Sequence, residues 1–214
     1  IEYFDYFMNQ KNALGLNSCF MDLDDPLELF KHWMKEAEKK ETKLANSLSL
    51  ATTNKEGQPD VRMVLLKGFS SKGFVFYTNL NSSKSLDLKN NPKGAMCFYW
   101  KSIERQIRIL GNITLVSDKE ADVYFKSRPY ESKISAWASD QSNPMKERSD
   151  ILKKIENFKK KYKDNNSVPR PHYWSGWCLK PSSIEFWLNK DNRVHERLKY
   201  IKKLSGWKKE ILYP

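Results

Sequence analysis

The sequence predicts a mainly β protein with peripheral helices, folded as a closed or partly closed β-barrel. Short runs rich in Val, Ile, Phe, Tyr and Thr recur along the chain, and Gly, Asn, Ser or Pro bound them. The helical patterns fall between groups of these runs rather than after each one, which argues against a βαβ array. With 214 residues, 39% of them hydrophobic, the chain can bury one core. We therefore expect one domain over residues 25–214, preceded by an N-terminal segment, residues 1–24.

Each element of the first half has a local signal. Asp25 can cap a helix that has Pro26 in its first turn, and the helical pattern runs to about Lys40. A short helix over residues 82–90 is expected to stop before Pro92. Apolar or alternating runs predict five strands, at residues 48–53, 61–67, 74–78, 95–100 and 106–116.

The second half is predicted to begin with helices and to end with strands. Ser117 can cap a helix that continues to about Lys126. Asn143-Pro144 predicts the start of a long, charged helix that ends near Tyr162. Four strands follow, at residues 176–179, 183–188, 193–200 and 207–212.

Several classes of chemistry lack their motifs in this chain. The eight glycines form no GxGxxG, Walker or GxSxG pattern, and the three histidines and three cysteines are too scattered for a metal site. No apolar run is long enough to cross a bilayer, and residues 1–5 do not resemble a signal peptide. We therefore expect a cytoplasmic protein without a metal ion or a membrane partner.

The net charge of +12 has more than one explanation. A lysine-rich surface gives solubility, and it also attracts nucleic acid or small phosphorylated metabolites. The chain lacks the sequence signatures of RRM and C2H2 modules, so we expect no nucleic-acid partner. The remaining Arg, Lys, Gln, Ser, Tyr and Trp residues suit a planar, phosphorylated ligand, with an organic cofactor to bring the reactivity.

The stretch Arg193-Val194-His195-Glu196-Arg197 gives the strongest indication of a binding site. In a strand, residues 193, 195 and 197 would all point the same way. Two guanidiniums and an imidazole on one face repel one another unless an anionic or electron-rich group lies between them. Guanidinium groups also suit planar or phosphorylated ligands. The pattern alone is equally compatible with a solvated edge strand.

Two other segments place cations where a phosphate could bind. Arg62 and Lys67 bracket an apolar strand, so these cations either end the strand in water or meet anions. Tyr77-Thr78 precedes Ser82-Ser83-Lys84 at a helix start, where free amide groups favour a phosphate. An ordinary N-cap with a surface lysine has the same pattern.

A third segment lies at the end of a predicted helix. Tyr124 and Arg128 are four residues apart, and Ser132 follows them. Together they could form a phosphate cup, although an arginine at a helix end often caps carbonyl groups. Gln141-Ser142 could recognise a ligand amide or simply lead into the next helix.

Read in order, these segments resemble the pyridoxine (pyridoxamine) 5′-phosphate oxidase family, FMN enzymes of vitamin B6 metabolism. The motifs YFxSRP, SxIxAWxSxQS and RxHxR are specific in combination, and the resemblance runs colinearly from Leu48 to Pro214. The matching stretches are RMVLLKGF, GFVFYTNLNSSKS, NNPKGAMCFYW, ERQIRILG, YFKSRPYESKISAWASDQS, VPRPHYWSGW, IEFW and RVHERLKY.

The resemblance implies a fold and a reaction. The fold is an FMN-binding split β-barrel, assembled as a homodimer with FMN at the interface. The reaction oxidises pyridoxine 5′-phosphate or pyridoxamine 5′-phosphate to pyridoxal 5′-phosphate, with O2 as acceptor and H2O2 as product. The implied chemical step is hydride transfer from C4′ of the substrate to flavin N5.

The resemblance also implies site residues. Arg193 and His195 are the implied catalytic residues, because they could hold the pyridine ring over the flavin. The implied substrate contacts are Lys67, Tyr124, Arg128, Ser132, Arg193 and His195. The implied FMN contacts are Arg62, Met63, Val64, Leu65, Leu66, Lys67, Tyr77, Thr78, Ser83, Lys84, Gln106, Gln141, Ser142, Trp187 and Arg197.

The chain departs from the family pattern in two places. Ser83 stands where many members have Arg, so we expect a serine hydrogen bond in place of one cation and a weaker FMN affinity. Residues 1–24 lack the basic pattern of a family lid, and we expect them to form a mobile lid without site residues. Two rival functions are a split-barrel flavin reductase with a different substrate and a basic nucleic-acid or scaffold protein without flavin.

Overall fold

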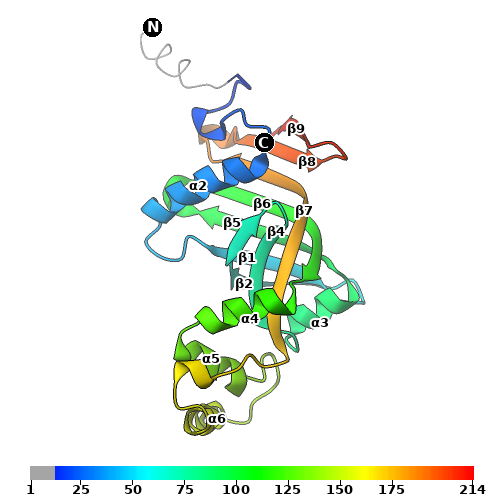
Figure 1. Cartoon of the computed structure of the whole chain (residues 1–214). Helices are drawn as coiled ribbons and strands as arrows, with labels where there is room; N and C mark the ends of the chain where they lie inside the picture. The colour runs from blue at the N-terminus through cyan, green and yellow to red at the C-terminus, as the bar shows by residue number, and fades with distance from the viewer. Residues whose placement is uncertain (1–12) are drawn as a thin grey trace.

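The computed structural model describes residues 13–214, in which nine strands form one antiparallel sheet flanked by helices (Figure 1). The strand order is β2-β1-β5-β6-β7-β4-β3, with β8 paired to β7 and β9 paired to β8. The strands are β1 (Ser47–Thr53), β2 (Pro59–Leu65), β3 (Gly68–Ser70), β4 (Gly73–Asn79), β5 (Lys93–Trp100), β6 (Arg105–Leu115), β7 (Trp174–Leu188), β8 (Glu196–Lys202) and β9 (Trp207–Leu212). The helices are α2 (Pro26–Lys40), α3 (Ser83–Asn90), α4 (Asp118–Ser127), α5 (Tyr130–Ala138) and α6 (Arg148–Lys161).

The two edges of the sheet meet, which curves it into a barrel. β2 leads directly into β3, and the N–H of Lys67 donates to the carbonyl of Val75 in β4 at 2.8 Å. The predicted fold class, mainly β with peripheral helices in a split barrel, is therefore confirmed.

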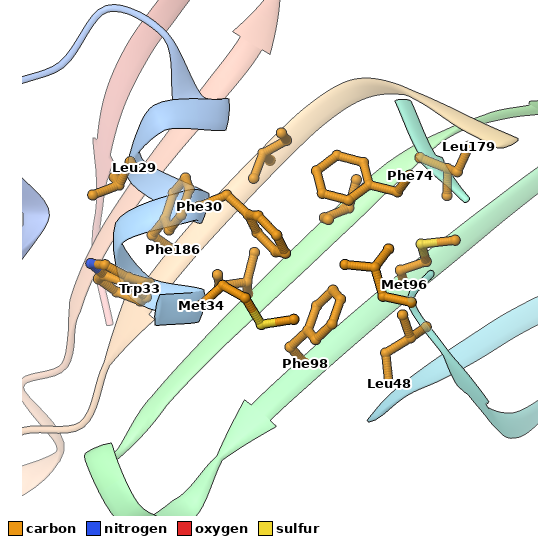
Figure 2. Close-up of a cluster of buried hydrophobic side chains, with 14 of the residues drawn as sticks. Leu29, Phe30, Trp33, Met34, Leu48, Phe74, Met96, Phe98, Leu179 and Phe186 are labelled. Atoms are coloured by element: carbon orange, nitrogen blue, oxygen red, sulfur yellow. The ribbon is translucent and has the colours of Figure 1, made fainter. Parts of the chain in front are cut away.

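The main core lies between the inner face of the sheet and α2 (Figure 2). Phe98, Ile107, Phe186 and Leu198 are partners in register across β5, β6, β7 and β8, and none of them is exposed to solvent. Phe30 of α2 packs edge-on against Phe98. Burial of each such side chain stabilises the fold by roughly 1.5–3 kcal/mol, so this row fixes which face of the sheet points outward.

A second, smaller core lies at the other end of the sheet. Phe125 of α4, Ile134 of α5 and Trp174 at the start of β7 are all buried there with Val168. Half-buried aromatic side chains from α5, α6 and their connections pack around these four residues. This cluster anchors α4 and α5 beside the beginning of β7.

Residues 13–24 lie against the hairpin formed by β8 and β9. The hydroxyl of Tyr200 donates to the carbonyl of Leu23 at 2.8 Å, and Lys209 pairs with Asp22 at 2.6 Å. The N–H of Asn17 donates to the carboxylate of Glu196 at 2.6 Å. Residues 1–12 of the expected lid lie outside the described residues, and the lid stays a prediction.

The predicted strands 176–179 and 183–188 are wrong as separate elements, because both belong to the single strand β7. Pro181 lies between the two predicted strands and pairs with Gly111 of β6, next to the register shift between Leu110 and Gly111. A proline is tolerated at such an irregularity because no ladder hydrogen bond is required of its nitrogen.

The predicted strand 193–200 is also wrong at its start, since β8 begins only at Glu196. Residues 191–193 form a short 3-10 turn in which Asn192 and Arg193 have φ angles of 55° and 62°. This left-handed backbone breaks the alternation of a strand. The argument that residues 193, 195 and 197 face the same way as strand neighbours therefore fails.

The helices of the second half differ from the prediction in two respects. The long charged helix begins at Arg148 rather than at Asn143-Pro144, because Glu147 and Asp150 form the capping box at its start. Helix α5 was not predicted, although Pro129 immediately before it is a common signal of a helix start. The remaining predicted elements are present, with ends shifted by a few residues, and the short β3 was taken for a turn.

Candidate functional site

A cavity of about 540 Å³, the basic pocket, lies between the end of β2, β4, α3, α4 and the start of β7. Lys67, Lys84 and Arg128 supply three cations to its wall, and none of the carboxylates of residues 13–214 lines it. The complete lining is Met63, Val64, Leu65, Lys67, Tyr77, Thr78, Lys84, Tyr124, Ser127, Arg128, Pro129, Ser132, Gln141 and Trp174. Such an excess of unpaired positive charge indicates a site for an anion.

Lys84 is the buried cation of this pocket. Its ammonium lies 3.3 Å from the hydroxyls of Thr78 and Ser82, and it forms no ion pair within residues 13–214. Burial, reinforced by the charge of Arg62, lowers the pKa of Lys84. An anion bound beside Lys84 would restore the stabilisation that burial removes from its charged form.

Arg128 ends α4 and faces the pocket with one nitrogen unpaired. Its Nη1 is buried and has no hydrogen-bond partner among residues 13–214. The guanidinium lies 4.6 Å from the centre of the Trp174 ring, and burial lowers the pKa of Arg128. A buried guanidinium donor without an acceptor is costly, and since Arg128 lines the pocket, an anion bound there would offset part of this cost.

Two tyrosines offer hydroxyl donors beside Arg128. The rings of Tyr77 and Tyr124 are stacked, with centroids 3.9 Å apart. Burial raises the pKa of Tyr77 to about 12 and also raises the pKa of Tyr124. Both hydroxyls therefore keep their protons near neutral pH and can donate to a bound anion.

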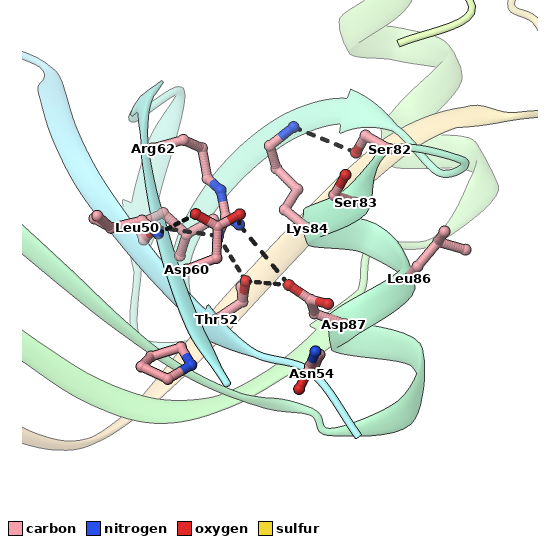
Figure 3. A network of polar contacts seen from close by, with 12 residues as sticks. Leu50, Thr52, Asn54, Asp60, Arg62, Ser82, Ser83, Lys84, Leu86 and Asp87 are labelled. Carbon is pink, nitrogen blue, oxygen red and sulfur yellow. Dashed lines mark hydrogen bonds and ion pairs between the residues drawn. The ribbon is translucent and has the colours of Figure 1, made fainter. Parts of the chain in front are cut away.

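Arg62 does not line the pocket. Its guanidinium donates to Thr52 and to Asp60, both at 2.6 Å, and lies 3.8 Å from Asp87 of α3 (Figure 3). Asp87 in turn accepts a hydrogen bond from Thr52 at 2.7 Å. This network holds α3, and with it Lys84, against β1 and β2.

The other residues expected near the cofactor lie around the pocket. Gln141 accepts hydrogen bonds from the Thr78 hydroxyl at 3.2 Å and from the N–H of Asn79 at 3.4 Å. Ser142 accepts from the N–H of Ser83 at 3.3 Å, at the start of α3. Leu66 is buried in the main core instead of in the pocket wall.

The remaining expected residues gather at the opposite end of β7, where β8 begins. Gln106, Trp187 and Arg197 are register partners on β6, β7 and β8 and share the outer face of the sheet, opposite to Phe186. His195 lies beside them, with its ring 4.7 Å from that of Trp187. We call Gln106, Trp187, Arg193, His195 and Arg197 the arginine–histidine corner.

His195 is oriented by the turn that precedes β8. The backbone N–H of Lys190 donates to its Nδ1 at 3.2 Å. A neutral ring must then carry its proton on Nε2. Arg193 is exposed on the same turn and makes no ion pair among the described residues, so it is available to a ligand.

Arg197 is held by two acceptors. Its Nε and Nη2 both donate to Oε1 of Glu185, at 3.0 and 2.8 Å, and its Nη1 donates to the carbonyl of Tyr213 at 2.9 Å. Glu185 is buried and also lies 3.5 Å from Arg108. Glu185 therefore fixes the plane of the Arg197 guanidinium on the outer face of the sheet.

A single chain does not bring all the expected residues together. Trp174 lines the basic pocket and Trp187 belongs to the corner, and thirteen residues of extended strand separate them, on the order of 40 Å. Figure 1 shows α4 near one end of β7 and the β8–β9 hairpin at the other. Tyr124 and Arg128 are thus far from Arg193 and His195 within one chain.

Sequence reasoning missed four residues: Ser127, Pro129 and Trp174 in the pocket wall, and Glu185 beside the corner. Trp174 lines the pocket against Arg128, and Glu185 holds Arg197. Glu185 could have been found, because it lies two residues before Trp187 in one predicted strand and so shares its face. Trp174 carries no such signal, since its contact depends on how α4 docks.

The fold and the pocket define a split-barrel protein with a carboxylate-free, cationic binding site. Comparisons with known proteins are more specific, and the chain belongs to the pyridoxamine 5′-phosphate oxidase family. The family model "Pyridoxamine 5'-phosphate oxidase" matches residues 34–162, and "Pyridoxine 5'-phosphate oxidase C-terminal dimerisation region" matches residues 174–214.

Curated relatives cover nearly the whole chain. A pyridoxine/pyridoxamine 5′-phosphate oxidase of Pelagibacter ubique is 57% identical over 97% of this chain and 100% of its own length. The corresponding protein of Sinorhizobium fredii is 46% identical over 91% of this chain and 95% of its own length.

Solved structures support the fold. PhzG from Burkholderia lata, solved with tetrahydrophenazine-1-carboxylic acid, has a TM-score of 0.86 and 24% identity over 96% of this chain and 100% of its own. A pyridoxamine 5′-phosphate oxidase-related, FMN-binding protein from Nostoc punctiforme has a TM-score of 0.72 and 18% identity, over 91% of this chain and 100% of its own. At these identities the likeness extends to the fold alone. Within residues 13–214, no helix has the length and apolar character needed to cross a membrane.

Proposed function

We propose that the protein is an FMN-dependent oxidase that converts pyridoxine 5′-phosphate or pyridoxamine 5′-phosphate to pyridoxal 5′-phosphate, with O2 as acceptor and H2O2 as product. The observation that carries this proposal is the 57% identity to a relative of that name over nearly the full chain. The basic pocket and the arginine–histidine corner supply the residue types that such ligands require.

The active form is proposed to be a homodimer whose sites lie between subunits. The outer face of the sheet carries Val61, Met63 and Tyr99, each about 60% exposed, and the register places Tyr99 next to Gln106. Large exposed apolar side chains on one face favour burial against a partner. A second copy bound to this face would place its basic pocket beside the arginine–histidine corner of the first copy. The pocket and the corner, which lie at opposite ends of β7 in one chain, would then form one site. The match to a C-terminal dimerisation region supports this assembly.

The residues present fit FMN. The buried ammonium of Lys84, at the start of α3, suits its phosphate, and Gln106 and Gln141 offer amide groups to its ring. Trp187 offers an aromatic plane on the outer face of the sheet. Bound FMN would supply the hydride acceptor and its reoxidation by O2.

The chain itself would bind and orient the substrate. Lys67, Tyr124, Arg128 and Ser132 line the pocket with two cations and two hydroxyls, which match a phosphate dianion. Arg193 and His195 of the partner subunit would hold the pyridine ring, with the Nε2 proton of that histidine as donor. Positioning of the substrate would therefore contribute more to the reaction rate than proton transfer by the protein.

An aerobic assay tests this proposal. Protein supplied with FMN should produce pyridoxal 5′-phosphate and H2O2 from pyridoxamine 5′-phosphate, and should be yellow with a flavin spectrum. Without oxygen the same substrate should bleach the colour. A flavoprotein that pyridoxamine 5′-phosphate leaves yellow would instead support a split-barrel reductase with another substrate.

A further inference from the structure

We infer that Trp174 and Arg170 are positioning residues, which fix the guanidinium of Arg128 in the plane that binds the substrate phosphate. The inference rests on the proposed function and deepens it. Neither residue was among the expected contacts of the substrate or of FMN.

Trp174 supplies an aromatic surface for Arg128. The Arg128 guanidinium lies 4.6 Å from the centre of the Trp174 ring, whereas it lies 5.5 Å from Phe125. Trp174 is only 5% exposed, so the contact is largely shielded from water. A cation–π contact of this kind gains strength when it is desolvated.

The Trp174 ring is itself locked in place. It is nearly parallel to the rings of Tyr77 and Tyr124, with interplanar angles of 10° and 4°, and Phe125 packs edge-on against it at 5.0 Å. Tyr77 lies on β4 and Tyr124 on α4, so one aromatic stack joins three elements of the pocket wall. The same stack therefore sets the positions of the Tyr124 hydroxyl and of Arg128.

Arg170 fixes the backbone beneath this stack. Its guanidinium donates to Asp122 at 2.5 Å, to Asp118 at 2.8 Å and to the carbonyl of Trp174 at 2.8 Å. The two carboxylates lie one turn apart on α4, and the carbonyl belongs to the first residue of β7. Arg170 thus holds the first half of α4 against the start of β7, and Arg128 follows the last residue of the same helix.

Arg128 needs such positioning because, among residues 13–214, its guanidinium has ring contacts with Trp174 and Phe125 and no ion pair. Its buried Nη1 has no hydrogen-bond partner within these residues. A mobile guanidinium would lose side-chain entropy each time it bound a phosphate. The aromatic surface orders the guanidinium before the phosphate binds, so less side-chain entropy is lost on binding. Loss of this surface should therefore weaken substrate binding and leave the chemical step unchanged.

Two substitutions of Trp174 separate the aromatic surface from simple filling of space. Trp174→Phe keeps a ring beneath Arg128, whereas Trp174→Met fills the site with a flexible apolar side chain. For FMN-loaded Trp174→Met we expect KM for pyridoxamine 5′-phosphate to rise about tenfold, with kcat within about threefold of wild type. Trp174→Phe should stay within about threefold in both constants, and FMN content should be equal in all proteins.

A double variant tests whether Trp174 acts through Arg128. Arg128→Ala alone should raise KM strongly, and adding Trp174→Met should raise it no further, because the partner of the ring is already absent. Independent, additive effects would show that Trp174 only supports the local core, and would overturn the inference.

Arg170 provides a second route if Trp174→Met does not fold. Arg170→Met should raise KM with little change in kcat, and Lys208→Met, which removes a remote surface ion pair with Glu210, is the matched control. The dissociation constant of pyridoxal 5′-phosphate, measured by calorimetry, should follow KM in every variant. An unchanged KM and dissociation constant in both Trp174→Met and Arg170→Met would refute the inference.

Binding and activity of the wild-type protein distinguish failure of the proposed function from failure of this inference. A wild-type protein that binds pyridoxal 5′-phosphate without oxidising pyridoxamine 5′-phosphate would contradict the proposed function, and the dissociation constants would still decide the inference. A wild-type protein that neither binds nor reacts would contradict both.

Discussion

At the scale of single residues, the site is a set of cations that the fold leaves without carboxylate partners. Arg62 and Arg197 are neutralised by Asp60 and Glu185, whereas Lys84 and Arg128 are not, within the part of the chain that the structure describes. Buried cations are usually paired because an unpaired one is costly, and the buried Lys133 donates to the carbonyl of Asn165 at 3.0 Å. The unpaired ones therefore mark the positions where ligand phosphates are expected.

Arg128 should act on the substrate rather than on the cofactor. Arg128→Ala should raise KM for pyridoxamine 5′-phosphate at least tenfold, the order expected when one charge-assisted hydrogen bond is lost. FMN content, read from the absorbance spectrum, should stay near that of wild type because Lys84, and not Arg128, is the cation proposed to bind the FMN phosphate. An equal loss of both would contradict the assignment of this residue.

Lys84 should make FMN binding sensitive to alkaline pH. Its pKa is lowered by burial, so the ammonium loses its proton at a lower pH than an ordinary lysine does. FMN affinity should be fully present below this pKa and should fall as the pH rises through it. Fluorescence titration of FMN measures this, and Lys84→Met should bind weakly at every pH. A Lys84→Met protein with the wild-type pH dependence would rule Lys84 out.

At the scale of elements, β7 is the part of the fold that organises the site. Its beginning contributes Trp174 to the basic pocket and its end contributes Trp187 to the corner. Gly111 makes the irregularity opposite Pro181 possible, because a Cβ there would lie 2.0 Å from the carbonyl oxygen of Lys180. The continuity of β7 thus depends on a glycine in its neighbour.

Gly111→Ala should destabilise the fold by roughly 1–3 kcal/mol, since backbone must shift to admit the methyl group. Chemical denaturation followed by fluorescence measures this change. Gly68→Ala is the matched control, because nothing lies within 4 Å of its added Cβ. Equal stability of the two variants would show that β6 and β7 tolerate a side chain at the irregularity.

Features of the fold that depend on neighbouring residues in the sequence could be predicted, and features that depend on distant residues could not. Caps and alternating runs are local, so the helix at Pro26 and most strands were predicted from sequence. The single β7 and the turn at Asn192 were not, because they depend on pairing with β6 and on two left-handed residues. Eleven of the expected site residues, between Met63 and Gln141, line the basic pocket. The sequence could not predict that this pocket lies far from Arg193 within one chain.

At the scale of the whole molecule, the central claim is that two chains complete each site. The basic pocket and the arginine–histidine corner lie at opposite ends of β7, and an apolar outer face lies between them. In the proposed twofold dimer the pocket of one subunit would meet the corner of the other, so two different subunits would supply the two halves of each site.

Subunit complementation tests this claim most directly. Arg128→Ala damages the pocket and Arg197→Met damages the corner, so each variant alone should have little activity at substrate concentrations well below KM. After the two proteins are unfolded together and refolded, half of the dimers should be mixed, and each mixed dimer should hold one intact site, which gives about a quarter of wild-type activity. Activity that stays at the level of the separate variants, although mixed dimers form, would contradict a site shared between subunits.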